Sequence, residues 1–385
     1  MARLGDVCDI LNGFAFKSEQ YVNDGIRIIR IANVQKGYVE DSTPIFYPID
    51  SKDAKKYSLK EDDILMSLTG NVGRVAKLSK EFLPAALNQR VACLRIKDGI
   101  ALDKAFLFNL LNSDYFEQQC IAASKGVAQK NMSTEWLKEY EIPMFSMEQQ
   151  KASASVLDKV TELITLRKEQ LAKLDQLVKS RFIELFGEPS SNPMGWKETT
   201  IGAECYYIKD GPHKSLPDVG EGNGYPFISV RNIVNGYIDF STARYISEQD
   251  YLDSIKKCHP QKGDMLYSKG GTTGIAKLID VDVEFANWVH VAVLKFDSTL
   301  NGVFFENMLN SDYCYDQSQR LTKGIANRDL VLSAMAQIKM YKPPIELQGQ
   351  FATFVEQTDK SKLAIQQSLD KLELLKKSLM QEYFG

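Results

Sequence analysis

Leu111-Asn112-Ser113-Asp114-Tyr115 recurs letter for letter as Leu309-Asn310-Ser311-Asp312-Tyr313, 198 residues further along the chain. At the same spacing, Lys125-Gly126-Val127-Ala128 corresponds to Lys323-Gly324-Ile325-Ala326. Self-similarity at a fixed distance is typical of a chain assembled from repeated structural units. The sequence therefore predicts two copies of one unit within its 385 residues.

The repeat extends to both sides of these motifs. Downstream, six positions match at the same spacing: Leu171, Lys173, Leu174, Ser180, Phe186 and Gly187 with Leu369, Lys371, Leu372, Ser378, Phe384 and Gly385. Upstream the spacing drifts by a few residues, and the matches are Asn33 and Gly37 with Asn232 and Gly236, Asp63–Ser67 with Asp264–Ser268, and Gly13–Ser18 with the shorter Gly211–Ser215. The repeat thus covers nearly the whole chain.

The first part of each unit has the pattern of a mixed α+β domain. In the first copy, segments rich in Ile, Val and Leu and separated by turn signals predict strands over Ile26–Val34, Asp63–Ser67, Arg74–Leu78 and Arg90–Ile96. A helix is predicted over Lys104–Ala122, because its apolar residues fall at helical spacing.

A long helix is predicted to end each unit. Between residues 147 and 185, apolar side chains lie seven apart with others between them: Leu157, Val160, Ile164, Leu171, Leu174, Val178 and Leu185. This heptad spacing is typical of a coiled-coil helix. The second copy, Gln348–Tyr383, has a comparable stripe: Ile365, Leu369, Leu372, Leu375 and Leu379. Two helices of matched length most simply pair with each other, so we expect an antiparallel coiled coil with a globular domain at each end.

Four segments are therefore expected along the chain. Residues 1–146 form the first domain and residues 147–187 its helix. Residues 188–345 form a linker and the second domain, and residues 346–385 the second helix. The linker is recognised by its turn-rich composition between Gly187 and Gly195.

Composition excludes several classes of protein. No apolar run reaches the ~18 residues that a membrane span needs, and the N-terminal residues lack the apolar core of a signal peptide. Six singly scattered cysteines and three histidines argue against a zinc site or a disulfide framework, and suit a reducing cytoplasm. The net charge of −3 is unlike that of most DNA-binding proteins. Any binding to DNA must therefore rest on local basic patches or on positively charged partners.

No motif in the chain indicates a catalytic centre. Gly270–Gly274 lacks the GK[ST] ending of a phosphate-binding loop. Asn192-Pro193-Met194-Gly195 lacks the aromatic residue of the Asn-Pro-Pro-aromatic motif of amino-methyltransferases. His259 and His290 are interpreted as structural, and Asp62-Asp63 as a solvated turn. We expect neither catalysis nor a metal site in this chain.

The order of motifs where each domain meets its helix resembles the specificity (S) subunits of type I restriction–modification systems. These motifs are Lys125-Gly126, Ile142-Pro143-Met144-Phe145 and Glu148-Gln149-Gln150 in the first half, and Lys323-Gly324 and Pro343-Pro344-Ile345-Glu346-Leu347-Gln348 in the second. Family members carry an IPxPPxxEQ entry to the helix, from which the second copy departs with Gln348-Gly349-Gln350. The helix endings Leu185-Phe186-Gly187 and Tyr383-Phe384-Gly385 are also similar to the family, as is the linker from Asn192-Pro193 to Gly195-Trp196. The resemblance covers essentially the whole chain.

The resemblance implies two tandem target-recognition domains and a DNA-binding function without catalysis. Each domain would read one half of a bipartite, asymmetric target in the major groove of double-stranded DNA, and the helices would fix the unread spacer. Half-sites about one helical turn apart, roughly 34 Å, lie on the same face of the duplex.

The resemblance also implies partners, cofactors and a location. Two methyltransferase (M) subunits would dock on the helices, on exposed faces such as Lys168, Glu169, Lys173 and Gln176. Two motor–nuclease (R) subunits would join them in the cytoplasm. S-adenosylmethionine, ATP and Mg²⁺ would be bound by these other subunits, and no cofactor by this chain.

Three loops in each domain are the candidates for contact with DNA, because they carry amide, hydroxyl and cationic groups beside glycines. In the first domain the loops are 16–18, 67–71 and 125–131, with the candidates Lys17, Ser18, Thr69, Asn71, Lys125, Gln129 and Lys130. In the second they are 213–215, 268–273 and 323–328, with the candidates His213, Lys214, Lys269, Thr272, Thr273, Lys323, Asn327 and Arg328. Arg30 and Arg231, in strand-like segments outside these loops, are further candidates. Asn33 and Asn232 recur in both copies, which favours a shared scaffold or phosphate role over base reading.

Two other functions fit the same pattern. The chain could be the recognition subunit of a fused methyltransferase–nuclease (type IIB-like) system, or a coiled-coil adaptor that binds protein rather than DNA. The acidic isoelectric point, near 5.8, is the only feature that supports the adaptor. Neighbouring genes for a separate methyltransferase and helicase–nuclease, or for a fused enzyme, would discriminate among the three.

Overall fold

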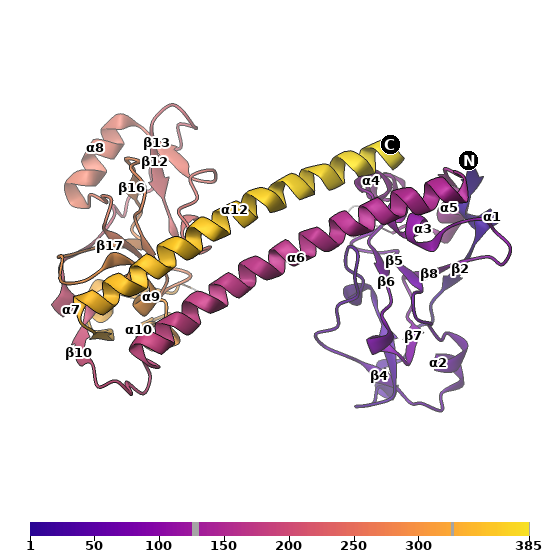
Figure 1. The fold of residues 1–385 in the computed structure, drawn as a ribbon, viewed down its shortest axis with the longest axis horizontal. Coiled ribbons are helices and arrows are strands. Elements are labelled where there is room, and N and C mark those ends of the chain that lie inside the picture. The colour runs from indigo at the N-terminus through magenta and orange to yellow at the C-terminus, as the bar shows by residue number, and fades with distance from the viewer. Residues whose placement is uncertain (125–130, 325–326, 385) are drawn as a thin grey trace. The chain divides into compact units, whose positions relative to one another are not determined.

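A computed structural model describes residues 1–124, 131–324 and 327–384 (Figure 1). The chain divides into two compact units, one of Met1–Lys168 with Gln367–Gly385 and one of Glu169–Gln366. Each unit therefore combines one globular domain with segments of both long helices.

Unit 1 carries three small sheets. A four-stranded antiparallel sheet has the order β2-β8-β5-β6, a three-stranded sheet the order β4-β3-β7, and β1 pairs with β9. Its elements are β1 (Ala2–Arg3), α1 (Leu4–Val7), β2 (Cys8–Asn12), η1 (Ser18–Gln20), β3 (Ile26–Ile29), η2 (Ile31–Asn33), β4 (Phe46–Tyr47), α2 (Lys52–Lys56), β5 (Ile64–Ser67), β6 (Val75–Lys77), η3 (Lys80–Phe82), β7 (Ala85–Leu87), β8 (Val91–Ile96), α3 (Lys104–Leu111), α4 (Asp114–Ala123), α5 (Thr134–Glu139) and β9 (Glu141–Ile142). The long helix α6 (Met147–Phe186) follows.

Unit 2 repeats the same topology. Its sheets have the orders β11-β17-β14-β15, β13-β12-β16 and β10-β18. The elements are β10 (Lys197–Thr200), α7 (Ile201–Glu204), β11 (Cys205–Asp210), β12 (Tyr225–Ile228), η4 (Val230–Asn232), β13 (Arg244–Ile246), α8 (Glu248–Lys257), β14 (Met265–Ser268), β15 (Ala276–Leu278), β16 (Ala286–Asn287), β17 (Val291–Phe296), α9 (Gly302–Leu309), α10 (Asp312–Leu321), α11 (Leu332–Met335), β18 (Lys339–Lys342) and α12 (Ile345–Phe384). The predicted duplication of an α+β unit is confirmed.

Two sequence-based boundaries were wrong. The strand expected over Ile26–Val34 ends at Ile29, because the chain turns into the single 3₁₀ turn η2. The helix expected over Lys104–Ala122 is two helices, α3 and α4. Ser113 separates the two helices, because its side chain accepts a hydrogen bond from the Phe116 backbone N–H and so caps the N-terminus of α4.

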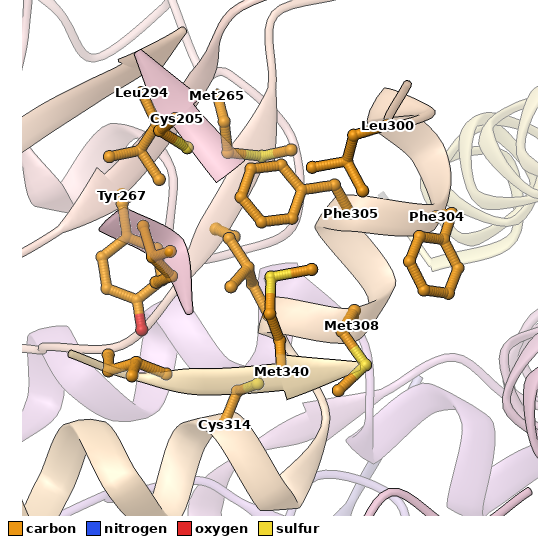
Figure 2. Close-up of a cluster of buried hydrophobic side chains, with 14 of the residues drawn as sticks. Cys205, Met265, Tyr267, Leu294, Leu300, Phe304, Phe305, Met308, Cys314 and Met340 are labelled. Atoms are coloured by element: carbon orange, nitrogen blue, oxygen red, sulfur yellow. The ribbon is translucent and has the colours of Figure 1, made fainter. Parts of the chain in front are cut away.

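The core of each domain lies between the four-stranded sheet and the helices that follow it. In unit 2, side chains from β11, β14, β17, α9, α10 and β18 meet in one cluster (Figure 2). Tyr267 and Phe305 are fully buried there. Unit 1 has the corresponding cluster around Phe106 and Phe116.

Helices α6 and α12 are each 40 residues long (Figure 1). Burial along them follows most of the predicted apolar stripe. On α6, all seven residues of that stripe are buried or half-buried. On α12 the stripe departs from the prediction at Leu375, which is 45% exposed. Within unit 2 the helices run antiparallel, because Asp175 forms an ion pair with Lys362 at 2.7 Å while Phe182 packs against Phe351.

The last phenylalanine of each helix packs into a domain. Phe186, at the end of α6, contacts Phe304 of α9 in unit 2, with ring centroids 4.8 Å apart. Phe384, at the end of α12, contacts Phe106 of α3 in unit 1 at 5.4 Å. Because Phe186 and Phe384 are equivalent positions of the repeat, both units are completed by the same contact.

Candidate nucleic-acid interface

Four loops meet at one end of the four-stranded sheet in unit 2. They are residues 211–215, 269–274, 288–290 and 323–329, and residues 325–326 of the last loop lie outside the described chain. The backbone N–H of Lys269 donates to the His290 carbonyl at 2.8 Å, and that of Gly271 to the Arg328 carbonyl at 3.0 Å. Gly211 lies so close to the Asn287 carbonyl that a Cβ would approach its oxygen to 1.8 Å, which explains the glycine. The three predicted loops are therefore brought together, around a fourth.

The same loops meet in unit 1. The Leu68 N–H donates to the Arg90 carbonyl at 2.9 Å, and the Met132 N–H to the Leu68 carbonyl at 2.9 Å. Gly13 approaches the Asn88 carbonyl as Gly211 approaches Asn287. The candidates Lys125, Gln129 and Lys130 lie outside the described residues.

Most of the remaining candidates present their side chains at the surface. The exposed ones are Lys17, Ser18, Asn71, His213, Lys214, Thr272, Lys323, Asn327 and Arg328. Four of these nine, Lys17, Lys214, Lys323 and Arg328, are cations, so the loops offer exposed positive charge in a chain of net negative charge.

Three candidates are buried instead. Thr69 is 4% exposed and Thr273 1%, and the Thr273 hydroxyl lies 2.9 Å from that of Thr322. Lys269 is 5% exposed, with its ammonium 2.9 Å from Asp329 and 3.6 Å from Asp210. Its charge is therefore engaged inside the domain, where it joins the loop of residues 323–329 to β14.

Arg30 and Arg231 hold a neighbouring loop in place. The Arg30 guanidinium donates a hydrogen bond to the Thr43 carbonyl at 2.9 Å, and the Arg231 guanidinium donates one to the Thr242 carbonyl at 2.8 Å. Arg30 is half-buried, whereas Arg231 is exposed.

The two recurring asparagines belong to the same scaffold. Asn33 and Asn232 are 3% and 1% exposed. Each accepts a hydrogen bond from a backbone N–H three residues earlier and donates to a carbonyl seven residues later. Their recurrence is explained by this scaffold role.

Comparison with known proteins identifies the family. The model of the type I restriction modification DNA specificity domain matches residues 1–176 and again residues 193–374. The chain belongs to this family. It is the DNA specificity subunit of a type I restriction–modification system, and specificity subunits are not catalytic.

Relatives and solved structures agree with this assignment. The EcoBI specificity subunit of Escherichia coli is 24% identical, over 92% of this chain and 78% of its own length. The MjaVIII specificity subunit of Methanocaldococcus jannaschii is 31% identical, over 46% of this chain and 43% of its own length. The crystal structure of the S subunit from M. genitalium has the same fold, with a TM-score of 0.61 at 18% identity, and covers 100% of this chain and 95% of the other. A structure of complex assembly in the type I R-M system matches with a TM-score of 0.57 at 18% identity, and covers 100% of this chain and 96% of the other.

The fourth loop of this specificity subunit was missed by the sequence interpretation. It consists of Gln89 and Arg90 in unit 1, both exposed, and of Trp288, Val289 and His290 in unit 2. The Trp288 and His290 rings meet edge to face, 4.9 Å apart. Within the described residues, neither the Trp288 Nε1 nor the His290 Nδ1 has a hydrogen-bond partner.

A signal for this loop was present in the repeat. On one side the copies share Asn88 and Asn287, and on the other Val91 and Val291. Between these matched residues the two copies differ both in length and in every side-chain type. Different side chains between shared flanking residues are expected of two domains that recognise different DNA sequences.

The described residues of the specificity subunit contain neither an exposed cysteine nor a cluster of side chains suited to a metal ion. All six cysteines are buried, and burial raises the pKa of each thiol, that of Cys258 to about 11. A thiol that stays protonated at neutral pH is a poor nucleophile and a poor metal ligand. No group of three His, Cys, Asp or Glu side chains that could hold a metal ion occurs in the described residues. None of the helices described is long and apolar enough to cross a membrane.

Proposed function

We propose that this specificity subunit reads a bipartite, asymmetric target in double-stranded DNA, with one half-site for each unit. The proposal rests on one observation: the same arrangement of four loops occurs twice, with different side chains in its central loop, the exposed Gln89 and Arg90 in unit 1 and the half-buried Trp288 and His290 in unit 2. Because the four loops have the same arrangement in both units, both units would dock on the duplex in the same way. Different side chains in the central loop provide different base contacts, because sequence is read by groups that reach the base edges.

The two classes of contact are assigned to different residues. Lys17, Lys214, Lys323 and Arg328 are exposed cations suited to phosphates, which fix the position of a protein on DNA. The loops 89–90 and 288–290 are the base readers in this proposal. Lys269, Thr69 and Thr273 are left out of the interface because their side chains are buried.

The partners are proposed to be two methyltransferase subunits and two motor–nuclease subunits. Apolar side chains on the long helices offer a surface for the methyltransferase subunits. Leu163, Leu166 and Leu374 are 43%, 46% and 69% exposed in unit 1, and Leu177 and Leu363 are 48% and 61% exposed in unit 2. These leucines would lose their contact with water when a methyltransferase subunit covers the helices, and this burial would stabilise the complex.

The other subunits are proposed to supply the chemistry and its cofactors: S-adenosylmethionine, ATP and Mg²⁺. The complex would act in the cytoplasm, where these cofactors and the DNA are available. In this assembly the specificity subunit contributes recognition and a scaffold.

Selection from a randomised duplex library tests the proposal. The chain is co-expressed with the methyltransferase subunit encoded beside it, and the purified complex selects DNA at moderate salt. The expected result is enrichment of two different short half-sites across a fixed unread gap. A folded complex that enriches no sequence would overturn DNA recognition and favour a protein-binding adaptor.

A further inference from the structure

The two units differ at two equivalent helix positions. In unit 2, Val178 and Phe182 of α6 are 8% and 6% exposed and belong to the main core cluster. The repeat spacing of 198 residues places Lys376 and Met380 of α12 at these positions in unit 1. Lys376 and Met380 thus stand where two residues fill the core of unit 2.

A cavity of about 570 Å³ lies at this place in unit 1. It is lined by residues from α3, the start of α4, α6 and α12, including Phe108, Tyr115, Ile164, Lys376, Lys377 and Met380. Volumes of ~300–1,000 Å³ are typical of pockets that hold small organic ligands. Apolar walls with a few polar groups are also typical of such pockets.

Two of the cations around the cavity, Lys376 and Lys377, are in no ion pair among the described residues. Lys36 forms ion pairs with Asp114 at 2.6 Å and Glu117 at 2.7 Å, and Lys168 with Glu373 at 3.0 Å. The Asp158 carboxylate accepts a hydrogen bond from the Asn109 amide at 2.9 Å. Among the described residues, no ion pair joins Lys376 or Lys377 to a carboxylate.

The surroundings of Lys376 disfavour the protonated, positively charged form of its side chain. Burial lowers the pKa of Lys376, and the cations Lys36 and Lys168 lower it further. Asp114 and Asp158 oppose this effect only in part. A bound anion would relieve both the repulsion and the lost hydration.

Two further polar atoms lack a partner beside the cavity. The Asn112 Oδ1 and the Thr161 Oγ1 are buried and have no hydrogen-bond partner among the residues that the structure describes, and both residues line the cavity. A buried acceptor without a partner costs free energy, which a ligand donor would recover. In unit 2, by contrast, the equivalent Asn310 amide bonds to the backbone of Ala276 through both its atoms.

We propose that this cavity of unit 1 binds a nucleoside phosphate. The phosphate lies against Lys376 and Lys377, and the base and sugar lie between the apolar walls with their polar groups toward Asn112 and Thr161. Charge-assisted contacts to phosphate are the strong term in such binding, and the apolar walls add contact area. The site is separate from the loops that read DNA, so its success or failure leaves the DNA-recognition proposal untouched.

Calorimetric titration of the full chain with ADP and GDP tests the proposal, with adenosine and inorganic phosphate as partial ligands. Two variants copy unit 2 into unit 1: Lys376→Val removes the cation, and Met380→Phe fills the cavity. Each variant introduces the apolar residue that the other copy already carries at the equivalent position, so we expect folding to be preserved. Lys371→Val, at an exposed position of the same helix, is the matched control.

The expected result is binding of at least one nucleotide to the wild type and to the Lys371→Val variant with equal affinity. The Lys376→Val variant then binds at least about ten-fold more weakly, as expected for the loss of one charge-assisted contact, and the Met380→Phe variant shows no binding. The proposal is overturned if neither nucleotide binds the wild type, or if both variants bind as tightly as the wild type. It is also overturned if inorganic phosphate binds as tightly as the nucleotides, because the cavity would then recognise only an inorganic ion.

Discussion

Replacing Phe186 by alanine tests the contact that ends α6. The Phe186 side chain is 4% exposed and packs against three rings of unit 2, those of Phe182, Phe304 and Phe351. Removing a buried phenylalanine typically costs about 3–5 kcal/mol, through lost burial and the cavity that remains. For a unit of this size, each kcal/mol lowers the melting temperature by roughly 2–4 °C. We therefore expect the melting temperature of unit 2 to fall by roughly 6–20 °C.

The assay is thermal unfolding followed by tryptophan fluorescence. Trp196 reports on this place directly, because its indole N–H donates to the Phe186 carbonyl at 2.8 Å. Ile183→Ala is the matched control, since Ile183 lies on the same helix and is 47% exposed. A shift of less than about 2 °C for Phe186→Ala, or an equal shift for both variants, would refute the proposed packing.

Three further outcomes are expected. Asn232→Ala removes the hydrogen bonds of a buried scaffold amide and should lower the free energy of unfolding by about 1–3 kcal/mol, as urea denaturation would show. Lys269→Ala removes the ammonium group that joins Asp329 to Asp210, while Lys257 still pairs with Asp210, so we expect about 1–3 kcal/mol of destabilisation by the same measurement; an unchanged free energy of unfolding would contradict a structural role. Lys323→Ala should weaken binding to all duplexes alike and reduce the slope of log K against log[salt] by about 1, and an unchanged slope would exclude a phosphate contact.

The duplication and the long helices were predictable because both leave periodic signals. Identical motifs 198 residues apart indicate two units whatever their fold, and heptad spacing fixes which face of α6 is buried. The break between α3 and α4 was missed because the apolar spacing continues through it, whereas the serine cap is a single residue.

The interface was only partly predictable, for a different reason. Loop composition identified three of the four loops, since glycine and polar residues mark turns. It could not show that Lys269 points inward, because its partners Asp210 and Asp329 are 59 and 60 residues away in the sequence and meet it only in the fold. Trp288 was not singled out and His290 was interpreted as structural, because the residues 288–290 contain neither the glycine nor the short polar residues that mark the other three loops.

The central claim is that each unit reads its own half-site through its own loop of distinctive sequence. The most direct test compares DNA selected by the wild-type complex with DNA selected by a complex carrying Trp288→Ala and His290→Ala. Tyr206→Ala, at the opposite end of β11 and 74% exposed, is the control. Loss of sequence preference at one half-site, with the other half-site and the gap unchanged, is the predicted result. Unchanged preference at both half-sites, or equal loss at both, would contradict the account.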